Sequence, residues 1–365
     1  MALPRGDCCG CKNAATMTND KPKLTIREVA AEAGVSRMTV TRVMRRDPLV
    51  APKTRAAVEA VISRMGYAPM HAARNLSSTK PRVIGVVSLR TAETEALGLG
   101  SEYLTTLHLG ALQVCNEADY GLVFFPSLDA ESVDTFIRRV RTRQLSGYVI
   151  AAPATETPQL IDALVENKIP FSAINPANLS NCPMAVISDD RLAVRQLVEE
   201  MIRQGHRRIA FAGAGGHARA NSERLAGYKD AFDAPGASRL RPVIYESKGI
   251  AFADGLALGR EIFAKANRPT AIQCITDDMA AGLIAATHER RLAMPEALSI
   301  TGFDNFGLAT RLYPALSTAT LPLMKMAEAA TRQVLGTLEG HDVKPLLRFP
   351  CEVVLRDSIG TVHAK

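Results

Sequence analysis

The sequence has no apolar run as long as the roughly 20 residues that a membrane-spanning helix needs. Its first twenty residues, MALPRGDCCGCKNAATMTND, also lack the apolar core of a secretory signal peptide. We therefore expect a protein that stays in the cytoplasm and has no membrane partner. With 365 residues and 47% hydrophobic content, the chain is long enough to form two or three globular domains.

The seven cysteines offer no recognisable metal site. Cys8, Cys9 and Cys11 are crowded together, and no second group follows that would complete a zinc site. An odd number of cysteines in a chain without an export signal indicates reduced thiols rather than a disulfide framework. We expect neither a metal nor a cofactor.

Catalytic motifs are equally scarce. The sequence shows no Ser-His-Asp set and no phosphate loop, and the run His288 to Leu292 breaks the HExxH zinc pattern at its last position. The run Gly213 to Ala218 does fit the G-x-G-x-x-A dinucleotide fingerprint, with Asp230 and Asp233 beyond it, but this signal is weak on its own. We expect that the protein is not an enzyme, and keep a dinucleotide-dependent enzyme as an alternative.

Positive charge is concentrated near the N-terminus. Between Lys21 and Arg82 there are thirteen Lys or Arg residues against four acidic ones, a surplus of nine, whereas the whole chain carries only +7. Residues 1–20 balance to zero, so residues 83–365 carry −2. A basic module on a near-neutral body is the pattern expected of a protein that neutralises the DNA backbone with one end.

Within the basic segment, residues 24–44 read as two short helices joined by a tight turn. Thr25 and Glu28 form a capping box, which predicts a helix that begins at Ile26. Gly34 permits the left-handed turn that ends this helix, and Ser36 can cap the next one. A third helix is expected from Pro52 to Gly66. The first helix buries one apolar face, made of Ile26, Val29, Ala30 and Ala33.

The second helix is expected to read DNA. Val40, Val43 and Met44 form its inner stripe. The outward side chains lie at the helix start, where base edges in a major groove would be met. They are Arg37, Met38, Thr39 and Arg42.

The segment after the third helix makes the pattern specific. The order of three helices, a "GY.P...AR.L" run at residues 66–76 and a strand RVIGVV at 82–87 resembles the LacI family of sugar-responsive repressors, from Leu24 to Ser358. The resemblance implies a hinge helix that folds on DNA, with Leu76 as a wedge in the minor groove. Met70 and Ala51 replace capping residues usual in that family, and Arg45 adds a predicted phosphate contact. Including these, the predicted DNA-contacting residues are Thr25, Ser36, Arg37, Met38, Thr39, Arg42, Arg45, Arg74 and Leu76.

From Pro81 onward, apolar runs of strand length alternate with amphipathic helical stretches, which indicates an α/β body with parallel sheets. These runs are 83–87, 122–125, 148–151, 171–174, 209–212, 271–275 and 299–303. The expected fold class is thus an N-terminal all-α helix-turn-helix domain with a hinge helix and a C-terminal α/β domain. The resemblance implies that this α/β effector domain has two lobes and is similar to periplasmic binding proteins.

The expected division is a disordered tail at 1–21, the helix-turn-helix domain at 22–66, the hinge helix and linker at 67–81, the two-lobed domain at 82–358 and a tail at 359–365. Lobe 1 is expected at about 82–185 and 320–345, and lobe 2 at about 186–319 and 346–358.

Polar residues that follow the strands are the candidates for effector binding, because ligands bind at the carboxyl ends of parallel strands. The resemblance implies an effector site made of Tyr103, Asn175, Asp190, Arg224, Phe252, Thr276, Asp277 and Asp304. For each polar residue, a strand-end cap or a turn is the structural alternative. Ala151–Pro153 leaves the contact after the third strand in doubt, and the loop at 92–100 is either a lid or a surface insertion.

These features predict a dimeric transcriptional regulator, a repressor, that binds a pseudo-palindromic double-stranded operator and responds to a sugar or sugar derivative between its lobes. No leucine heptads follow Ser358, so the resemblance implies a homodimer rather than a tetramer. A corepressor-dependent regulator and a stand-alone sugar-binding protein remain as alternatives.

Overall fold

The computed structural model describes residues 24–44, 47–67, 81–88, 101–125, 135–138, 142, 145–215, 219–233, 237 and 240–361. The chain forms two compact units, Met1–Thr79 and Lys80–Lys365. Several predictions fall outside the described residues: the tail at 1–21, the hinge helix with Met70, Arg74 and Leu76, the side chain of Arg45, and the loop at 92–100. None of the helices among the described residues is long and apolar enough to cross a membrane.

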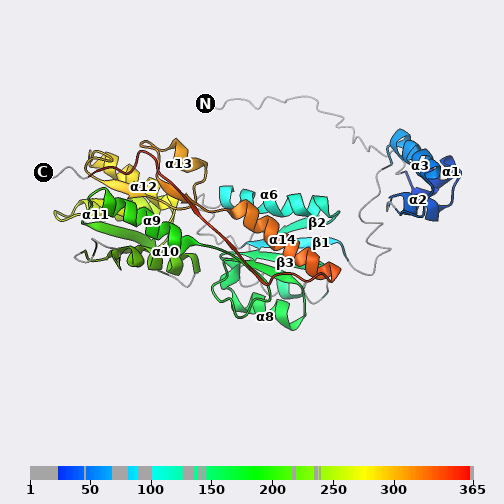
Figure 1. Ribbon diagram of the computed structural model, residues 1–365, viewed down its shortest axis with the longest axis horizontal. Coiled ribbons are helices and arrows are strands. Elements are labelled where there is room, and N and C mark those ends of the chain that lie inside the picture. Colours follow the sequence, from blue (N-terminus) through cyan, green and yellow to red (C-terminus); the bar gives the residue numbers. More distant parts are fainter. Residues whose placement is uncertain are drawn as a thin grey trace, which may run out of the picture. The chain divides into compact units, whose positions relative to one another are not determined.

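The first unit contains the three predicted helices, α1 (Ile26–Glu32), α2 (Arg37–Met44) and α3 (Pro52–Met65) (Figure 1). Gly34 has a φ of +63°, so the turn between α1 and α2 uses the left-handed backbone that glycine adopts without strain. Valine dominates the small core, which is formed by Val29, Ala30, Val40, Val43, Val50, Val58 and Val61. The apolar stripes predicted for the first two helices do face this core.

The second unit is built on two parallel sheets. The described strands of the first sheet are, in spatial order, β11 (Leu346–Phe349), β5 (Ala185–Ser188), β4 (Phe171–Ile174), β3 (Gly147–Ala151), β1 (Val83–Ser88) and β2 (Gly121–Phe125). Those of the second sheet are β7 (Val243–Ser247), β6 (Ile209–Ala214), β8 (Ala271–Cys274) and β9 (Ser299–Thr301). The predicted α/β class with parallel sheets is confirmed.

Helices cover both faces of the first sheet, which is why its central strands are continuous apolar runs rather than alternating ones. Figure 1 shows α6 (Ser101–Glu117) and α14 (Leu323–Glu339) on one side and α8 (Pro158–Glu166) on the other. Successive residues of β1 accordingly enter different cores, since Val86 packs with the α6 and α14 side and Val87 packs with the α8 side.

The second sheet is flanked by two helix pairs, α9 (Asp190–Arg203) with α10 (Arg219–Asp230), and α11 (Phe252–Phe263) with α12 (Asp277–Glu289). The short helix α13 (Gly307–Arg311) follows β9. The chain runs from β6 through α10 to β7 in one direction, and then through α11 to β8 and through α12 to β9 in the other. With the right-handed crossovers usual for parallel strands, this reversal places the two pairs on opposite faces of the sheet.

Within the described residues the chain passes between the sheets three times, after β5, between β10 (Thr318–Thr320) and α14, and between β11 and β12 (Glu352–Val354). β10 and β12 pair as an antiparallel ribbon. The sequence predicted that the chain enters lobe 2 at about residues 186 and 346. In the structure it enters a few residues later, because β5 and β11 still belong to the first sheet. The short, half-exposed strands β7, β11 and β12 carry too little apolar pattern to be recognised in advance.

Helices α11 and α12 touch through two glycines. A Cβ atom added to Gly282 would lie 2.1 Å from the carbonyl oxygen of Phe252, and one added to Gly255 would lie 2.2 Å from that of Met279. Neither contact can be relieved by moving a side chain, because both involve backbone. This close approach fixes the start of α11, and with it the position of Phe252.

Gly282→Ala is therefore expected to lower the free energy of unfolding by about 1–3 kcal/mol, because overpacking forces the two helices apart. This loss outweighs the gain of about 0.5–1 kcal/mol that alanine normally brings to a helix interior. Urea unfolding of the purified protein measures the change. Gly215→Ala, where an added Cβ meets nothing within 4 Å, is the matched control. Equal stabilities of the two variants would contradict the close helix contact.

Candidate functional site

The start of α2 presents the side chains predicted to read DNA. Arg37 and Met38 are exposed, Met38 to 64%. The Arg42 side chain is 54% exposed, with its Nε 3.8 Å from Asp47 Oδ2. Thr39 differs from the prediction, because it is only partly exposed and its hydroxyl lies 2.9 Å from that of Ser36. The outward set among the described residues is thus Arg37, Met38 and Arg42.

The caps of α1 and α2 hold these helices in place. As predicted, Ser36 caps α2, since its Oγ accepts a hydrogen bond from the Thr39 N–H at 3.1 Å. At α1 the predicted box is only half formed. Glu28 accepts hydrogen bonds from the Thr25 N–H at 2.6 Å and from the Thr25 hydroxyl at 2.9 Å, so this hydroxyl donates instead of accepting from the helix. These hydrogen bonds from Thr25 lower the pKa of Glu28.

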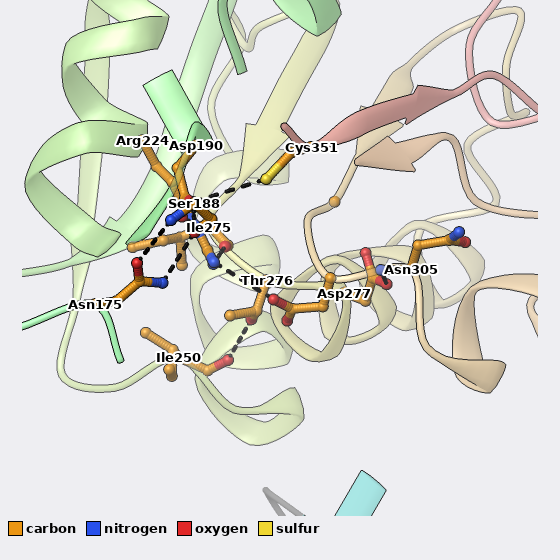
Figure 2. A network of polar contacts seen from close by, with 12 residues as sticks. Asn175, Ser188, Asp190, Arg224, Ile250, Ile275, Thr276, Asp277, Asn305 and Cys351 are labelled. Carbon is orange, nitrogen blue, oxygen red and sulfur yellow. Dashed lines mark hydrogen bonds and ion pairs between the residues drawn. The ribbon is translucent and has the colours of Figure 1, made fainter. Parts of the chain in front are cut away.

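Arg224 is the centre of the predicted effector site in the second unit (Figure 2). It is buried on α10, and each of its three guanidinium nitrogens donates a hydrogen bond. Nε donates to Asp190 at 2.8 Å, Nη1 to the Ile275 carbonyl at 2.6 Å, and Nη2 to Asp304 at 3.5 Å. The guanidinium carbon also lies 3.7 Å from the centre of the Phe303 ring, within cation–π distance. Arg224 is thus held in one position by side chains of two segments and a backbone carbonyl of a third.

Asp190 connects this centre to the first sheet. It accepts a hydrogen bond from Ser188 at the end of β5. Ser188 is paired twice with Asn175, since the Asn175 amide donates to its hydroxyl at 2.9 Å and accepts from its N–H at 3.0 Å. The Cys351 thiol lies 3.9 Å from Asp190. Two of the three segments that connect the sheets, the one after β5 and the one between β11 and β12, therefore contact the Asp190 carboxylate (Figure 2).

Two further predicted carboxyls lie close by, of which Asp277 is buried and Asp304 is partly buried. Asp277 accepts hydrogen bonds from the Thr318 hydroxyl at 2.6 Å and from the Asn305 N–H at 2.8 Å. Burial raises the pKa of Asp277 to about 6 and raises that of Asp304 well above its ordinary value, although the positive charge of Arg224 lowers both. Asp304 also has a φ of +124°, a strained backbone conformation of the kind that concentrates at functional sites.

Thr276 has a structural role as a helix cap. Its hydroxyl accepts a hydrogen bond from the Met279 N–H at 3.2 Å and donates to the Ile250 carbonyl at 2.8 Å. Phe252, two residues after Ile250, is the first residue of α11 and is 43% exposed. Their predicted contact with the effector stays a prediction.

The first lobe reaches this cluster through the start of α6. Tyr103 is partly buried, and its pKa is raised by burial and then by the negative charge of Asp304. Its neighbour Glu102 accepts a hydrogen bond at 2.8 Å from the N–H of Gly307, the first residue of α13 in the second lobe. The negative charge of Glu102 also contributes to the raised pKa of Asp278, after burial.

The structure thus brings Tyr103, Asn175, Asp190, Arg224, Asp277 and Asp304 into one region. Sequence reasoning missed Glu102, Ser188, Asn305 and Cys351. The first three lie next to or two residues from a predicted site residue, which is the signal that could have found them. Nothing in the sequence marked Cys351, because its contact with Asp190 spans 161 residues.

The buried carboxyl of Asp277 makes stability depend on pH. Because its folded-state pKa of about 6 exceeds the ordinary value of 3.8, its contribution to stability is fully present below about pH 4 and is lost as the pH rises through 6. Asp277→Asn is expected to remove this loss, which has a slope of at most about 1.4 kcal/mol per pH unit. The asparagine amide can still accept from the Asn305 N–H and donate to Thr318.

Urea unfolding of the protein and of this variant at several pH values between 4 and 7.5 measures the difference in slope. Asp342→Asn makes the same chemical change at an exposed site and serves as the control. Parallel stability curves for the protein and Asp277→Asn over this range would contradict the raised pKa.

Comparisons with known proteins agree with this architecture. Residues 25–70 match the family described as bacterial regulatory proteins, lacI family, and residues 198–359 match the periplasmic binding protein-like domain. The chain is 29% identical over 338 residues to the HTH-type transcriptional regulator AscG of Escherichia coli (strain K12), an alignment that covers 92% of this chain and 98% of that protein.

Two solved structures share the fold over 92% of this chain. A lac repressor dimer bound to operator and the anti-inducer ONPF has a TM-score of 0.76 at 21% identity, with 98% of its own chain covered. A complex of the transcriptional regulator CelR with cellobiose has a TM-score of 0.68 at 22% identity, with 99% covered. With both domains in the order that the sequence predicted, the resemblance is confirmed: the chain combines a DNA-binding domain of the lacI family of bacterial regulatory proteins with a periplasmic-binding-protein-like domain.

Proposed function

We propose that this protein is a sequence-specific transcriptional regulator, a repressor, that binds a pseudo-palindromic operator as a homodimer and changes its DNA affinity when a small molecule binds between the lobes. The observation that carries the proposal is the combination, in one chain, of an exposed basic helix α2 with the buried network around Arg224. This function is exerted on DNA in the cytoplasm, and it assigns the chain no catalytic step.

The basic charge of residues 21–82 and the exposed side chains of α2 support DNA recognition. Arg37 and Arg42 can donate paired hydrogen bonds to base edges, with Arg favouring guanine, and Met38 can contact a thymine methyl group. The lac repressor, which was crystallised on its operator, shares the fold over 92% of this chain. The contribution of the hinge helix and of the Leu76 wedge remains a prediction.

The polar groups around Arg224 support effector binding, because carboxylates and amides recognise hydroxyl-rich ligands and because two structural relatives hold cellobiose and ONPF. Asn175 and Tyr103 belong to the first lobe, whereas Arg224, Asp277 and Asp304 belong to the second. A ligand that contacts both groups favours one arrangement of the lobes. It can change operator affinity only by the difference in its affinity for the two arrangements.

Exposed apolar side chains on the first lobe support the homodimer. Leu109 and Leu112 on α6 and Val123 and Phe124 on the edge strand β2 are each 38–49% exposed, and the His108 ring stacks on Phe124 at 3.7 Å. A contiguous apolar surface of this kind marks an interaction site. We assign its occupant as the same surface of a second copy, since a dimer axis repeats each patch.

Leu109→Asp is expected to weaken the dimer at least about tenfold, because it places a charge in a desolvated interface. Analytical ultracentrifugation at decreasing protein concentration measures the change. Leu192→Asp, on the exposed face of α9 in the second lobe, is the control that adds the same charge. An unchanged dimer in the Leu109 variant, together with a weakened one in the control, would move the interface to the other lobe.

The function itself is tested by incubating the purified protein with fragmented genomic DNA from its source and sequencing the retained fragments. We expect one enriched pseudo-palindrome with a flexible pyrimidine–purine step at its centre. An Arg37→Ala/Arg42→Ala double variant is the control and should retain no such sequence. Absence of any enriched sequence, both in buffer and with a mixture of neutral sugars added, would contradict the proposal.

A further inference from the structure

Arg82 lies where the chain enters the second unit, directly before β1. Its side chain is bound at the C-terminal end of α6, where Nη2 donates a hydrogen bond to the Ala118 carbonyl at 2.6 Å and Nε donates to the Asp119 carbonyl at 3.2 Å. The guanidinium carbon also lies 4.5 Å from the centre of the Tyr120 ring, within cation–π distance. A cation is favoured at this place, because carbonyls after the last turn of a helix lack helical partners and the helix dipole is negative there.

The backbone around Arg82 is held as well. Its carbonyl accepts a hydrogen bond from the Gly121 N–H at 2.9 Å. Ser146 binds both neighbours, since its hydroxyl donates to the Pro81 carbonyl and its N–H donates to the Val83 carbonyl at 2.8 Å. Three consecutive residues are therefore fixed to the start of β2 and to the residue before β3.

The helix that binds Arg82 is itself fixed in the first lobe. Gly110, in the middle of α6, lies so close to α14 that an added Cβ atom would be 2.5 Å from the Met324 carbonyl oxygen. The same helix carries Leu109 and Leu112, two of the exposed apolar side chains assigned above to the dimer interface. The Arg82 side chain is therefore bound to an element of the proposed interface.

Residues 68–80 connect the three-helix unit to Pro81, so Pro81 is the point on the second unit from which a DNA-binding unit is reached. A dimer axis places the two copies of this point at a fixed separation, because each is held by the helix that carries the interface. When two binding modules are linked, the starting point and the length of the linker decide which site separations both can occupy. Helix-turn-helix dimers read half-sites at a defined spacing, so the anchoring of Pro81 and Arg82 bears directly on operator choice.

We propose that Arg82 is a positioning residue for operator recognition. Its two hydrogen bonds to the end of α6 fix the point from which each DNA-binding unit extends, and with it the separation between half-sites that the dimer prefers. The proposal rests on the proposed function, because it takes the homodimer and its pseudo-palindromic operator from there. In this role Arg82 needs no contact with DNA, since two of its guanidinium nitrogens already donate to the protein.

Fluorescence anisotropy with three DNA probes tests this role. The probes are the enriched operator, the same operator with two base pairs inserted at its centre, and a single half-site. Arg82→Ala should lower the ratio between the affinities for the first two probes at least about threefold, because a longer free connection is less selective for distance. Half-site binding should stay unchanged. An unchanged ratio in the folded variant overturns the proposal.

Arg207→Ala is the matched control. Arg207 is exposed, as Arg82 is, and it lies between the end of α9 and the start of β6 in the second lobe. Its Nη1 donates to the carbonyls of Ile202 and His206 at 3.1 and 3.0 Å. The control thus removes the same charge and the same kind of hydrogen bond away from the connection to the DNA-binding unit, and it should keep the ratio of the wild type. An equal fall of the ratio in both variants overturns the positioning role.

The salt dependence of operator binding distinguishes positioning from a phosphate contact. Arg82→Ala should leave this dependence unchanged, because the side chain is occupied by the end of α6. A slope that falls by about one for each Arg82 of the dimer would show that Arg82 neutralises a phosphate, and would overturn the proposal.

Amide hydrogen exchange of the full chain, measured without DNA, reports whether the variant frees the chain before β1. The Gly121 and Ser146 amides donate to Arg82 and Val83, so their exchange should accelerate at least about threefold in Arg82→Ala and stay unchanged in Arg207→Ala. Unchanged exchange at both amides in Arg82→Ala would show that its side chain does not hold this segment, and would overturn the proposal.

The failure of this proposal differs from that of the proposed function. If the wild-type protein retains the operator but Arg82→Ala keeps the preference for its spacing, only the positioning role fails. If the wild-type protein retains no operator under any condition tested, the regulator proposal fails and the positioning role fails with it.

Discussion

Asp190→Ala is expected to lower the free energy of unfolding of the second unit by about 3–5 kcal/mol, because it leaves the Arg224 guanidinium buried without its closest charged partner. Asp190 and Arg224 are 2% and 5% exposed, so solvent cannot replace the lost carboxylate. The remaining partner, Asp304, lies at 3.5 Å and is itself difficult to ionise, since burial raises its pKa. Urea unfolding followed by circular dichroism measures the loss.

Two further variants show whether the loss comes from the unpaired charge. Asp190→Asn keeps an oxygen that can accept from the Arg224 Nε–H, so it should lose less stability than the alanine variant. The double variant Asp190→Leu/Arg224→Met removes both charges, and should recover much of the stability because no ion is left buried alone. If the double variant is as unstable as the sum of its single variants, the cause is packing rather than charge.

The three helices of the first unit could be predicted almost residue by residue because their signals are local. Thr25, Ser36, Pro52 and Gly66 mark helix ends within one turn of the chain, and the observed helices begin and end where they indicate. The difference at α1 is also local. Thr25 and Glu28 were correctly identified as a pair, but their hydroxyl and carboxylate bond to each other, which propensity does not distinguish from a full box.

In the second unit, the buried strands could be predicted from the sequence, but the segments that connect the two sheets could not. The strands β1, β3 and β4 are buried along most or all of their length, so they appear in the sequence as continuous apolar runs. The ribbon strands β10 and β12 are only three residues long, and their pairing depends on contacts between residues more than thirty positions apart. No periodicity within such a short strand can predict its partner.

The sequence predicted which residues belong to the site, but not which of them contact one another. The resemblance gave Asn175, Asp190, Arg224 and Asp304 separately, whereas the structure joins them through hydrogen bonds, with Ser188 between Asn175 and Asp190. In the structure Arg224 bridges two carboxyl groups of the protein, those of Asp190 and Asp304.

Arg42→Ala is expected to remove about 1–3 kcal/mol of sequence discrimination at each half-site, since one arginine contact to a base edge contributes that amount. A dimer presents Arg42 twice, so operator binding by the dimer should weaken by about 2–6 kcal/mol, and binding to scrambled DNA by much less. Arg42 is suited to this role because its side chain is 54% exposed and its contact with Asp47 is long, at 3.8 Å. Releasing it to reach a base therefore costs little.

Competition between operator and scrambled DNA, measured by fluorescence anisotropy at several salt concentrations, distinguishes base reading from phosphate contact. Arg64→Ala removes the same charge from the same unit, but Arg64 lies on α3 and is paired with Glu32. This control should leave the ratio between operator and scrambled DNA unchanged. If Arg42→Ala lowers both affinities equally and reduces the salt dependence, Arg42 contacts a phosphate, and base recognition by α2 must come from Arg37 and Met38.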